Sequence, residues 1–272
     1  MTRNLLLFLF ALIISFSCSN KIAPTTSKPF TGTLKVMAYN VHHCEPPSKP
    51  GVIDLDAIVN VINRENPDLI ALQEIDVNIN RSGKINQASE IARKAGYPSF
   101  YFSKAIDYDG GDYGVLILSK YPLSEMETRK LPTEASTKGE PRVFSLATVT
   151  LPGGKKIKFG STHLDAQREP TNRILQANEI SRVTSSIHLP LIIAGDFNAV
   201  ENSDVMQIIK SKFTLSCSGC APTIPQINPT KTIDFIGFRP GNVFEVLSHK
   251  VVQEPYASDH LPVVAELRVT NL

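Results

Sequence analysis

Two spacings of apolar positions alternate along the chain and predict its secondary structure. Short, nearly continuous apolar runs are typical of buried strands, and apolar residues three or four positions apart are typical of helices. Strands are predicted at 34–39, 69–73, 115–118, 143–151, 156–162, 191–194, 232–238 and 262–269, and helices at 54–66, 87–95, 171–187 and 203–210. In the first helix, Leu55, Ile58 and Ile62 share one face, and Asp54 is a candidate N-cap.

The interleaving of strands and helices predicts an α/β (α+β) fold. Pro152, Gly153 and Gly154 join two strand-like runs, which is a hairpin signal and excludes a purely parallel sheet. No break in composition and no internal repeat divides residues 32–272, so one domain is expected there.

Composition narrows the class of protein. The chain has 272 residues, 42% of them hydrophobic and 20% charged, which is typical of a folded protein with a sizeable core. The 28 basic and 26 acidic residues leave a net charge of +2, which excludes binding to nucleic acid by surface charge alone. A small basic groove is not excluded. With no Trp and no run of Lys and Arg, the chain carries no strong signal for a surface that grips duplex nucleic acid.

The N-terminal segment has the pattern of a targeting signal. Arg3 precedes an apolar run over 5–16, which is shorter than the roughly 18 residues needed to span a bilayer. Residues 1–17 are therefore expected to be a secretory signal peptide, with an uncleaved anchor helix as the alternative. Cys18 follows directly and resembles the acylated cysteine of bacterial lipoproteins, with residues 18–31 as a polar tether. We expect a secreted or cell-envelope protein, either periplasmic or an outer-membrane lipoprotein attached through Cys18.

The cysteines are too few for a disulfide-framework fold. Cys217 and Cys220 form a CxxC beside Gly219 and Pro222, which indicates a loop. A four-ligand zinc site would need a second pair. In an oxidising compartment a local disulfide is the simplest interpretation, which leaves Cys44 as a lone thiol.

Polar residues recur where the predicted strands end, which is where α/β scaffolds collect their active sites. The positions are Asn40, Glu74, His163, Asp196 with Asn198, and Asp259 with His260, together with Asp234 inside a predicted strand. Alone, each is typical of a turn, a helix cap or a packed histidine. Together they would form a carboxylate-rich pocket, in which the carboxylates repel one another unless a cation binds. Oxygen ligands favour Mg²⁺, with Mn²⁺ or Ca²⁺ as alternatives, and carboxylate-bound Mg²⁺ commonly serves phosphate chemistry.

Seven segments, taken in order, resemble the endonuclease/exonuclease/phosphatase superfamily, which includes pancreatic deoxyribonuclease, abasic-site endonucleases, sphingomyelinases and inositol-polyphosphate phosphatases. They are AYNV (38–41), LQE (72–74), YG followed by VLILS (113–119), THL (162–164), GDFN (195–198), IDFI (233–236) and SDHLP (258–262). A single motif such as GDFN is weak, but the ordered set over residues 34–268 is specific. The resemblance implies a four-layer sandwich of two face-to-face mixed β-sheets flanked by helices.

The resemblance also implies roles for the strand-end residues. Glu74 would be the principal metal ligand, and Asn40 and Asp259 would complete or support the metal site. Asp196 would deprotonate the attacking water or protonate the leaving group. The remaining implied roles are phosphate contacts for Asn198, His163, His260 and Tyr113, and pairing of Asp234 with His260. Whether one or two metals bind is left open.

Further side chains have two interpretations each. Arg142 is either a surface arginine or a phosphate clamp. Arg81 and Lys84 bind a substrate headgroup or lie in a solvated loop, and His42 and His43 are weak candidates for lining the pocket. Arg173 and Gln176 are expected to be solvated or to cap a helix.

The leading hypothesis is a divalent-metal-dependent phosphoesterase that cleaves a phosphodiester, or a phosphomonoester, by in-line attack of water. A monomer is favoured. The alternatives are a secreted nuclease acting on DNA or RNA and a non-catalytic ligand-binding member of the same fold. A zinc or two-metal hydrolase of another type is disfavoured because HxxxH, HxH and DxH patterns are absent from the sequence.

Overall fold

The computed structural model describes residues 32–270, which form two six-stranded sheets. The first sheet contains β1 (Thr33–Asn40), β2 (Leu69–Val77), β3 (Ser99–Tyr108), β4 (Gly111–Ser119), β11 (Phe244–Val251) and β12 (Val263–Val269). The second contains β5 (Leu123–Lys130), β6 (Val143–Thr150), β7 (Lys156–His163), β8 (Leu191–Asp196), β9 (Thr214–Leu215) and β10 (Asp234–Arg239). Their orders are β11–β12–β1–β2–β4–β3 and β5–β6–β7–β8–β10–β9. The signal peptide, Cys18 and tether predicted for residues 1–31 lie outside the described residues.

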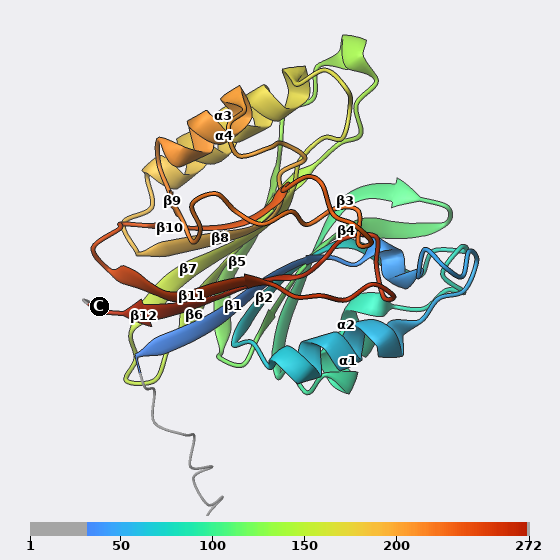
Figure 1. Ribbon diagram of the computed structural model, residues 1–272, viewed down its shortest axis with the longest axis horizontal. Coiled ribbons are helices and arrows are strands. Elements are labelled where there is room, and N and C mark those ends of the chain that lie inside the picture. The colour runs from blue at the N-terminus through green and yellow to red at the C-terminus, as the bar shows by residue number, and fades with distance from the viewer. Residues whose placement is uncertain (1–31, 271–272) are drawn as a thin grey trace, which may run out of the picture.

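Both sheets are mixed, and helices cover their outer faces (Figure 1). β1 and β2 are parallel, as are β7 and β8, and the other neighbouring strands are antiparallel. Helices α1 (Leu55–Glu65) and α2 (Gln87–Lys94) cover the first sheet, and α3 (Thr171–Ser185) and α4 (Asp204–Lys210) cover the second. The predicted four-layer α/β sandwich is therefore confirmed, and so is the predicted hairpin between β6 and β7.

Alternation along the central strands explains why the sheets stack. On β1, Leu34, Val36 and Ala38 belong to the core between the two sheets, whereas Met37 and Tyr39 belong to the core under the helices. Successive side chains of a strand point to opposite faces, so a strand that is apolar on both faces needs a cover on each side.

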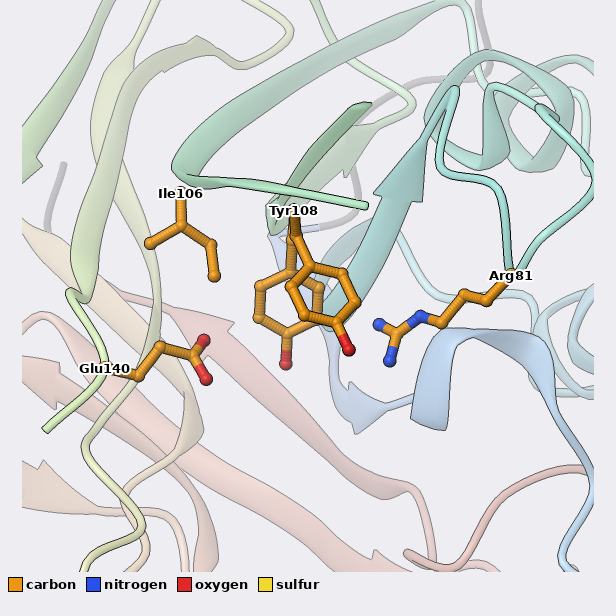
Figure 2. Close-up of a pocket in the computed structure, with 5 residues that line it drawn as sticks. Arg81, Ile106, Tyr108 and Glu140 are labelled. Carbon is orange, nitrogen blue, oxygen red and sulfur yellow. The ribbon is translucent and has the colours of Figure 1, made fainter. Parts of the chain in front are cut away.

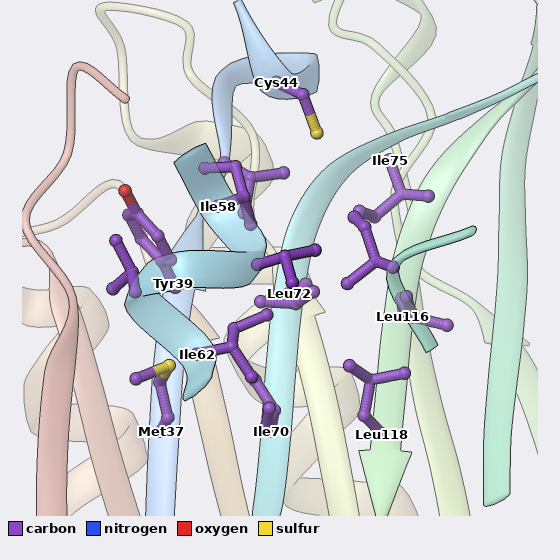
Figure 3. Packing of buried hydrophobic residues seen from close by; sticks show 14 of the residues in the cluster. Met37, Tyr39, Cys44, Ile58, Ile62, Ile70, Leu72, Ile75, Leu116 and Leu118 are labelled. Atoms are coloured by element: carbon purple, nitrogen blue, oxygen red, sulfur yellow. The ribbon is translucent and has the colours of Figure 1, made fainter. Parts of the chain in front are cut away.

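The helices bury their apolar faces against the sheets. In α1, Ile58 and Ile62 pack on Ile70 and Leu72 of β2 (Figure 3), and Asp54 accepts a hydrogen bond from the backbone N–H of Ala57 as the predicted N-cap. Burying each of these aliphatic side chains contributes roughly 1.5–3 kcal/mol. Within residues 32–270, no helix is both long enough and apolar enough to cross a bilayer.

The strands that the sequence pattern did not predict lie at sheet edges. β3 and β11 border the first sheet, β5 and β9 border the second, and most of their residues are at least partly exposed. Edge strands commonly carry charged residues, which discourage pairing with other chains. β5 (LSEMETRK) therefore lacks the apolar run by which the central strands were recognised.

The cysteine predictions hold where the structure describes them. Cys217 and Cys220 form a disulfide, and Cys44 is free and fully buried.

Candidate active site

Three neighbouring strands of the second sheet place three functional side chains side by side. His163 at the end of β7 lies opposite Asp196 at the end of β8, and Asp196 lies opposite Asp234 at the start of β10. All three residues are at most 4% exposed. Adjacent strands bring directly opposed side chains within contact distance, so this part of the site follows from register.

Asn40 links the two sheets through its side-chain amide. Its Nδ2 donates to Glu74 Oε1 at 2.9 Å and to Asp196 Oδ2 at 3.1 Å, while its Oδ1 accepts from the backbone N–H of His42 at 3.1 Å. These partners fix the orientation of the amide, since only the nitrogen can donate. Asn40 therefore supports Glu74 and Asp196 by orienting both carboxylates around one nitrogen.

A local backbone irregularity aims Glu74 into the site. The pairing of β2 with β4 shifts register between Leu72 and Ile75, and Glu74 has a φ of 61°. Such a bulge redirects a side chain that regular alternation would place elsewhere. Burial alone would raise the pKa of Glu74, but the adjacent His43, the nearby His163 and the Asn40 amide together hold this pKa well below its usual value. Glu74 is therefore a carboxylate at neutral pH.

His43 is the second neighbour of Glu74. Its Nδ1 lies 3.7 Å from Glu74 Oε2, and its Nε2 lies 3.4 Å from Glu45 Oε2. The turn that places it has positive φ at His42, His43 and Cys44, which is uncommon for residues other than glycine. Of the two weak candidates, His43 thus reaches Glu74. We call the cluster of Asn40, Glu74, His163, Asp196, Asp234 and His260 the carboxylate centre.

His260 and Asp234 form the expected pair. His260 Nδ1 lies 2.9 Å from Asp234 Oδ2, which also accepts from the Thr223 hydroxyl at 2.6 Å. Burial alone would lower the pKa of His260, but the Asp234 carboxylate outweighs it and raises this pKa. The other nitrogen, Nε2, is 3.7 Å from Asp196 Oδ2, so Asp234 orients the ring toward Asp196.

Asp196 lies at the centre of these contacts. One carboxylate oxygen accepts from the backbone N–H of Asn198 at 2.8 Å, and the other faces Asn40. Burial, and then the adjacent carboxylate of Asp234, raise the pKa of Asp196. A carboxylate whose affinity for a proton is raised in this way suits general-base chemistry.

Arg142 is buried and holds His163, so the interpretation of Arg142 as a surface arginine is wrong. Only 6% of Arg142 is exposed, and its Nη1 lies 3.2 Å from His163 Nδ1. Because a guanidinium only donates, Nδ1 must accept, which places the proton of neutral His163 on Nε2. Burial, and then the charge of Arg142, hold the pKa of His163 well below its usual value. The Nε2–H group lies 3.5 Å from Asp196 Oδ2.

The donor set fits a hard divalent cation. Asn40 Nδ2 donates to the Glu74 carboxylate, and the Ser258 hydroxyl, which donates to the Asn40 carbonyl at 2.7 Å, lies 3.4 Å from Asp259 Oδ1. Glu74 and Asp259 thus flank Asn40. Ligand atoms of Asp196, Asp234 and His260 also lie within 4.8 Å of one another and form a second possible position. There, however, His260 Nδ1 is already committed to Asp234.

A sequence model of the "Endonuclease/Exonuclease/phosphatase family" matches residues 37–260. The chain belongs to this family. No curated protein matches the sequence.

Solved structures of the endonuclease/exonuclease/phosphatase family share the fold. One from Beutenbergia cavernae has 22% identity and a TM-score of 0.75, with 88% of this chain and 72% of that chain covered. One from Bacteroides vulgatus has 20% identity and a TM-score of 0.71, with coverage of 88% and 99%. A mannosyl-6-phosphatase from Bacteroides thetaiotaomicron has 18% identity and a TM-score of 0.68, with coverage of 86% and 99%.

In this family member, Arg81 lies in an exposed turn, as one of its two interpretations expects, but its guanidinium is held by the protein. Its Nε and Nη2 donate to the two oxygens of buried Asp76, each at 2.9 Å, and its guanidinium stacks on Tyr108 and Tyr113. Tyr113 lies opposite Asp76 in the pairing of β2 with β4. Lys84 instead donates to the backbone carbonyl of Gly110 at 3.1 Å.

The expectation that Arg173 and Gln176 are solvated or cap a helix is wrong. Arg173 is 9% exposed and donates to the carbonyls of Asp165, Gln167 and Arg168, and Gln176 is fully buried and accepts from the backbone N–H of Asp165. Both side chains therefore hold the loop that follows β7.

Three residues that contact Asp234, Arg81 or Arg142 had no signal in the sequence. Thr223 lies in a loop between predicted elements, and Tyr108 and Glu140 lie outside the predicted strands. Ser258 was part of a quoted motif, but its link to the Asn40 carbonyl depends on the pairing of β1 with β12.

Proposed function

We propose that the chain is a divalent-metal-dependent phosphoesterase that hydrolyses a phosphodiester, or a phosphomonoester, by in-line attack of water. The observation that carries this proposal is the Asn40 amide, whose nitrogen contacts the carboxylates of Glu74 from one sheet and Asp196 from the other, close to the imidazoles of His43, His163 and His260. Membership of the endonuclease/exonuclease/phosphatase family supports a hydrolase acting on phosphoester bonds. The fold shared with a mannosyl-6-phosphatase is consistent with the monoester option.

Glu74 and Asp259 would hold Mg²⁺, or alternatively Mn²⁺ or Ca²⁺, with Asn40 keeping Glu74 in place. When bound, such an ion neutralises charge on the phosphoryl oxygens. The low pKa of Glu74 keeps its carboxylate charged for this task. The positive charge of the cation would offset the repulsion between the neighbouring carboxylates of the pocket.

The remaining side chains either accept a proton or donate hydrogen bonds to the phosphate. Asp196 takes a proton from the attacking water, and its raised pKa favours that transfer. His163 and His260 donate from Nε2 to the phosphoryl oxygens, and Asp234 keeps the His260 ring in position. One amide hydrogen of Asn198 is used on the Leu164 carbonyl, so the other is free to contact the scissile phosphate.

Hydrolysis of bis-p-nitrophenyl phosphate and p-nitrophenyl phosphate tests the proposal. Chelator-treated protein should be inactive and should regain activity with Mg²⁺ or Mn²⁺. Asp196→Asn and His260→Gln should each reduce kcat by at least ~10²-fold, the scale of a lost acid–base group. Exposed Asp204 and His188 provide the matched controls Asp204→Asn and His188→Gln, which should leave kcat unchanged. Folded Asp196 and His260 variants with wild-type turnover would refute the mechanism.

We also propose that the enzyme works in the cell envelope as a lipoprotein. The apolar run over residues 5–16 and the adjacent Cys18 support this proposal, and the Cys217–Cys220 disulfide is consistent with an oxidising compartment. Full-length protein expressed in bacteria should partition into the detergent phase, and Cys18→Ser should move it to the aqueous phase. Wild-type protein that remains aqueous would exclude lipid attachment.

A further inference from the structure

A cavity of about 120 Å³ lies beside the carboxylate centre, lined by Arg81, Ile106, Tyr108, Tyr113 and Glu140. Figure 2 shows the charged ends of Arg81 and Glu140 directed into it from opposite sides, with the Tyr108 ring between them. The cavity is polar at both ends and aromatic in the middle, which is the composition of a small-molecule site.

Two side chains of the cavity wall, Glu140 and Tyr113, lie next to residues that adjoin the centre. Glu140 Oε1 lies 3.4 Å from Nη1 of Arg142, and the same nitrogen contacts His163 of the centre. Tyr113, which lines the cavity, is on β4 opposite Asp76, two residues after Glu74. A group bonded to a phosphate at the centre would therefore extend into this cavity.

Charge compensation argues against a second anionic group in the cavity. The guanidinium of Arg81 is paired on two nitrogens with the fully buried carboxylate of Asp76, and Arg142 is paired with Glu140. The positive charges of Arg81 and Arg142 are thus each already balanced by a carboxylate. The groups still able to bond a ligand are the remaining N–H groups of Arg81, the second oxygen of Glu140 and the tyrosine hydroxyls. They match a neutral ligand that both donates and accepts hydrogen bonds.

The aromatic geometry and the size of the cavity limit the ligand further. The Tyr108 and Tyr113 rings are 6.5 Å apart at 53°, so they do not form the parallel-walled slot that would enclose a flat base. The volume is below the roughly 300 Å³ at which pockets for larger ligands begin, which restricts the occupant to one small ring. Tyr108 is 46% exposed, so the part of its ring that Arg81 does not cover can contact the C–H face of such a ring.

We propose that this cavity binds a single polyhydroxylated ring, such as a hexose or a cyclitol, that carries the phosphoester. The inference rests on the proposed phosphoesterase function and names its substrate class. Glu140 accepts from ring hydroxyls, Arg81 donates to them, and Tyr108 covers one face of the ring. Because a carboxylate left without hydroxyl partners loses its hydrogen bonds, Glu140 makes the cavity selective for hydroxylated rings over bare ones.

The first experiment compares kcat/KM at one Mg²⁺ concentration. Glucose 6-phosphate and inositol 1-phosphate represent soluble rings, phosphatidylinositol vesicles represent a lipid source, and the p-nitrophenyl ester of thymidine 5′-phosphate represents a nucleotide. p-Nitrophenyl phosphate is the reference ester without hydroxyls. At least one ring phosphate should exceed the nucleotide ester. Glu140→Gln and Tyr108→Ala should lower the ratio of ring phosphate to reference by about tenfold, the scale of a lost polar contact.

Matched substitutions outside the cavity control for general damage. Glu127 on β5 pairs with Arg129, and Tyr101 on β3 bonds the Thr128 hydroxyl, so neither lines the cavity. Glu127→Gln and Tyr101→Ala should leave the ratio unchanged. If these controls lowered the ratio of ring phosphate to reference by the same factor, the effect would not be specific to the cavity.

A second measurement separates this inference from the proposed function. Saturation-transfer NMR with glucose and myo-inositol on metal-free protein should show contact, and Glu140→Gln should weaken it. If p-nitrophenyl phosphate is hydrolysed while the nucleotide ester is preferred and neither polyol binds, the ring site is wrong and the phosphoesterase stands. If no ester is hydrolysed but the polyols bind through Glu140, the phosphoesterase is wrong and the polyol cavity stands.

Discussion

Asp234 holds His260 from a neighbouring element: its Oδ2 lies 2.9 Å from His260 Nδ1, and both side chains are almost completely buried. Thr223 donates to the same oxygen at 2.6 Å and fixes the carboxylate in turn. A carboxylate in this position sets which nitrogen of the imidazole faces the reacting atoms. The orientation of the His260 ring therefore depends on Asp234 and, through it, on Thr223.

Asp234→Asn should lower kcat by about 10²-fold or more, because the amide would no longer raise the pKa of His260 or hold its tautomer. Thr223→Val, which removes only the support of the carboxylate, should cost less. Steady-state kinetics and imidazole ¹⁵N chemical shifts measure the two effects. Unchanged shifts together with full activity would show that the pair is only structural.

Asn40→Asp should destabilise the metal-free protein by about 3 kcal/mol. The change places a third carboxylate against Glu74 and Asp196, and an unpaired buried charge is costly. Urea unfolding in a chelator measures the loss, and added Mg²⁺ should recover part of it. Exposed Asn202 supplies the control Asn202→Asp, which should change stability by less than about 0.5 kcal/mol. Equal stability of wild type and Asn40→Asp would contradict the crowded arrangement.

Mg²⁺ should raise the unfolding midpoint of the wild-type protein. A ligand at 100 times its Kd adds about 2.7 kcal/mol, which corresponds to roughly 5–10 °C in a protein of this size. Glu74→Gln should abolish the rise, whereas Glu179→Gln, which alters a surface pair with Arg182, should retain it. Calorimetry at constant ionic strength makes the comparison. A full Mg²⁺ response in Glu74→Gln would place the cation elsewhere.

Gly195→Ala should destabilise the fold by about 2–3 kcal/mol, because a Cβ there would overlap the Thr162 carbonyl oxygen. Gly153→Ala is the control. Gly153 has a φ of +83° but no neighbouring atom within 4 Å, so its substitution should cost only the roughly 1–2 kcal/mol of the left-handed conformation. Chemical unfolding distinguishes the two, and equal losses would argue against close packing at Gly195.

His163 should make the protein less stable in acid. Burial and the charge of Arg142 hold its pKa well below the usual value, so folded His163 stays neutral where the unfolded chain takes up a proton. Below about pH 6.5 the unfolded state therefore binds more protons, and stability falls as pH falls. Between about pH 6.5 and 5.5 the wild type should lose roughly 1 kcal/mol more than His163→Gln. Parallel urea titrations across this range would reveal identical profiles if the prediction is wrong.

The spacing of apolar residues was sufficient to predict the central strands and helices. Each of these elements has a buried face, and a buried face requires apolar residues at a regular spacing within the element itself. β1, β2, β7 and β8 and the helices over them carry apolar residues on the faces that the cores require, so their positions follow from spacing alone. The polar residues at the ends of these strands could be recognised because each directly follows an apolar run. Edge strands such as β3 and β5 bury too little surface to leave such a pattern.

By itself, the sequence determined the central strands and helices, the N-cap at Asp54 and the candidate residues of the centre. Only the tertiary structure decided which of them meet, because contacts such as Asn40 to Asp196, 156 positions apart, depend on how two sheets stack. The same packing buried Arg142 against His163 and turned Arg173 and Gln176 inward. It also assembled the cavity of Arg81, Tyr108 and Glu140 from separate strands and loops, since local spacing carries no information about which edges face each other.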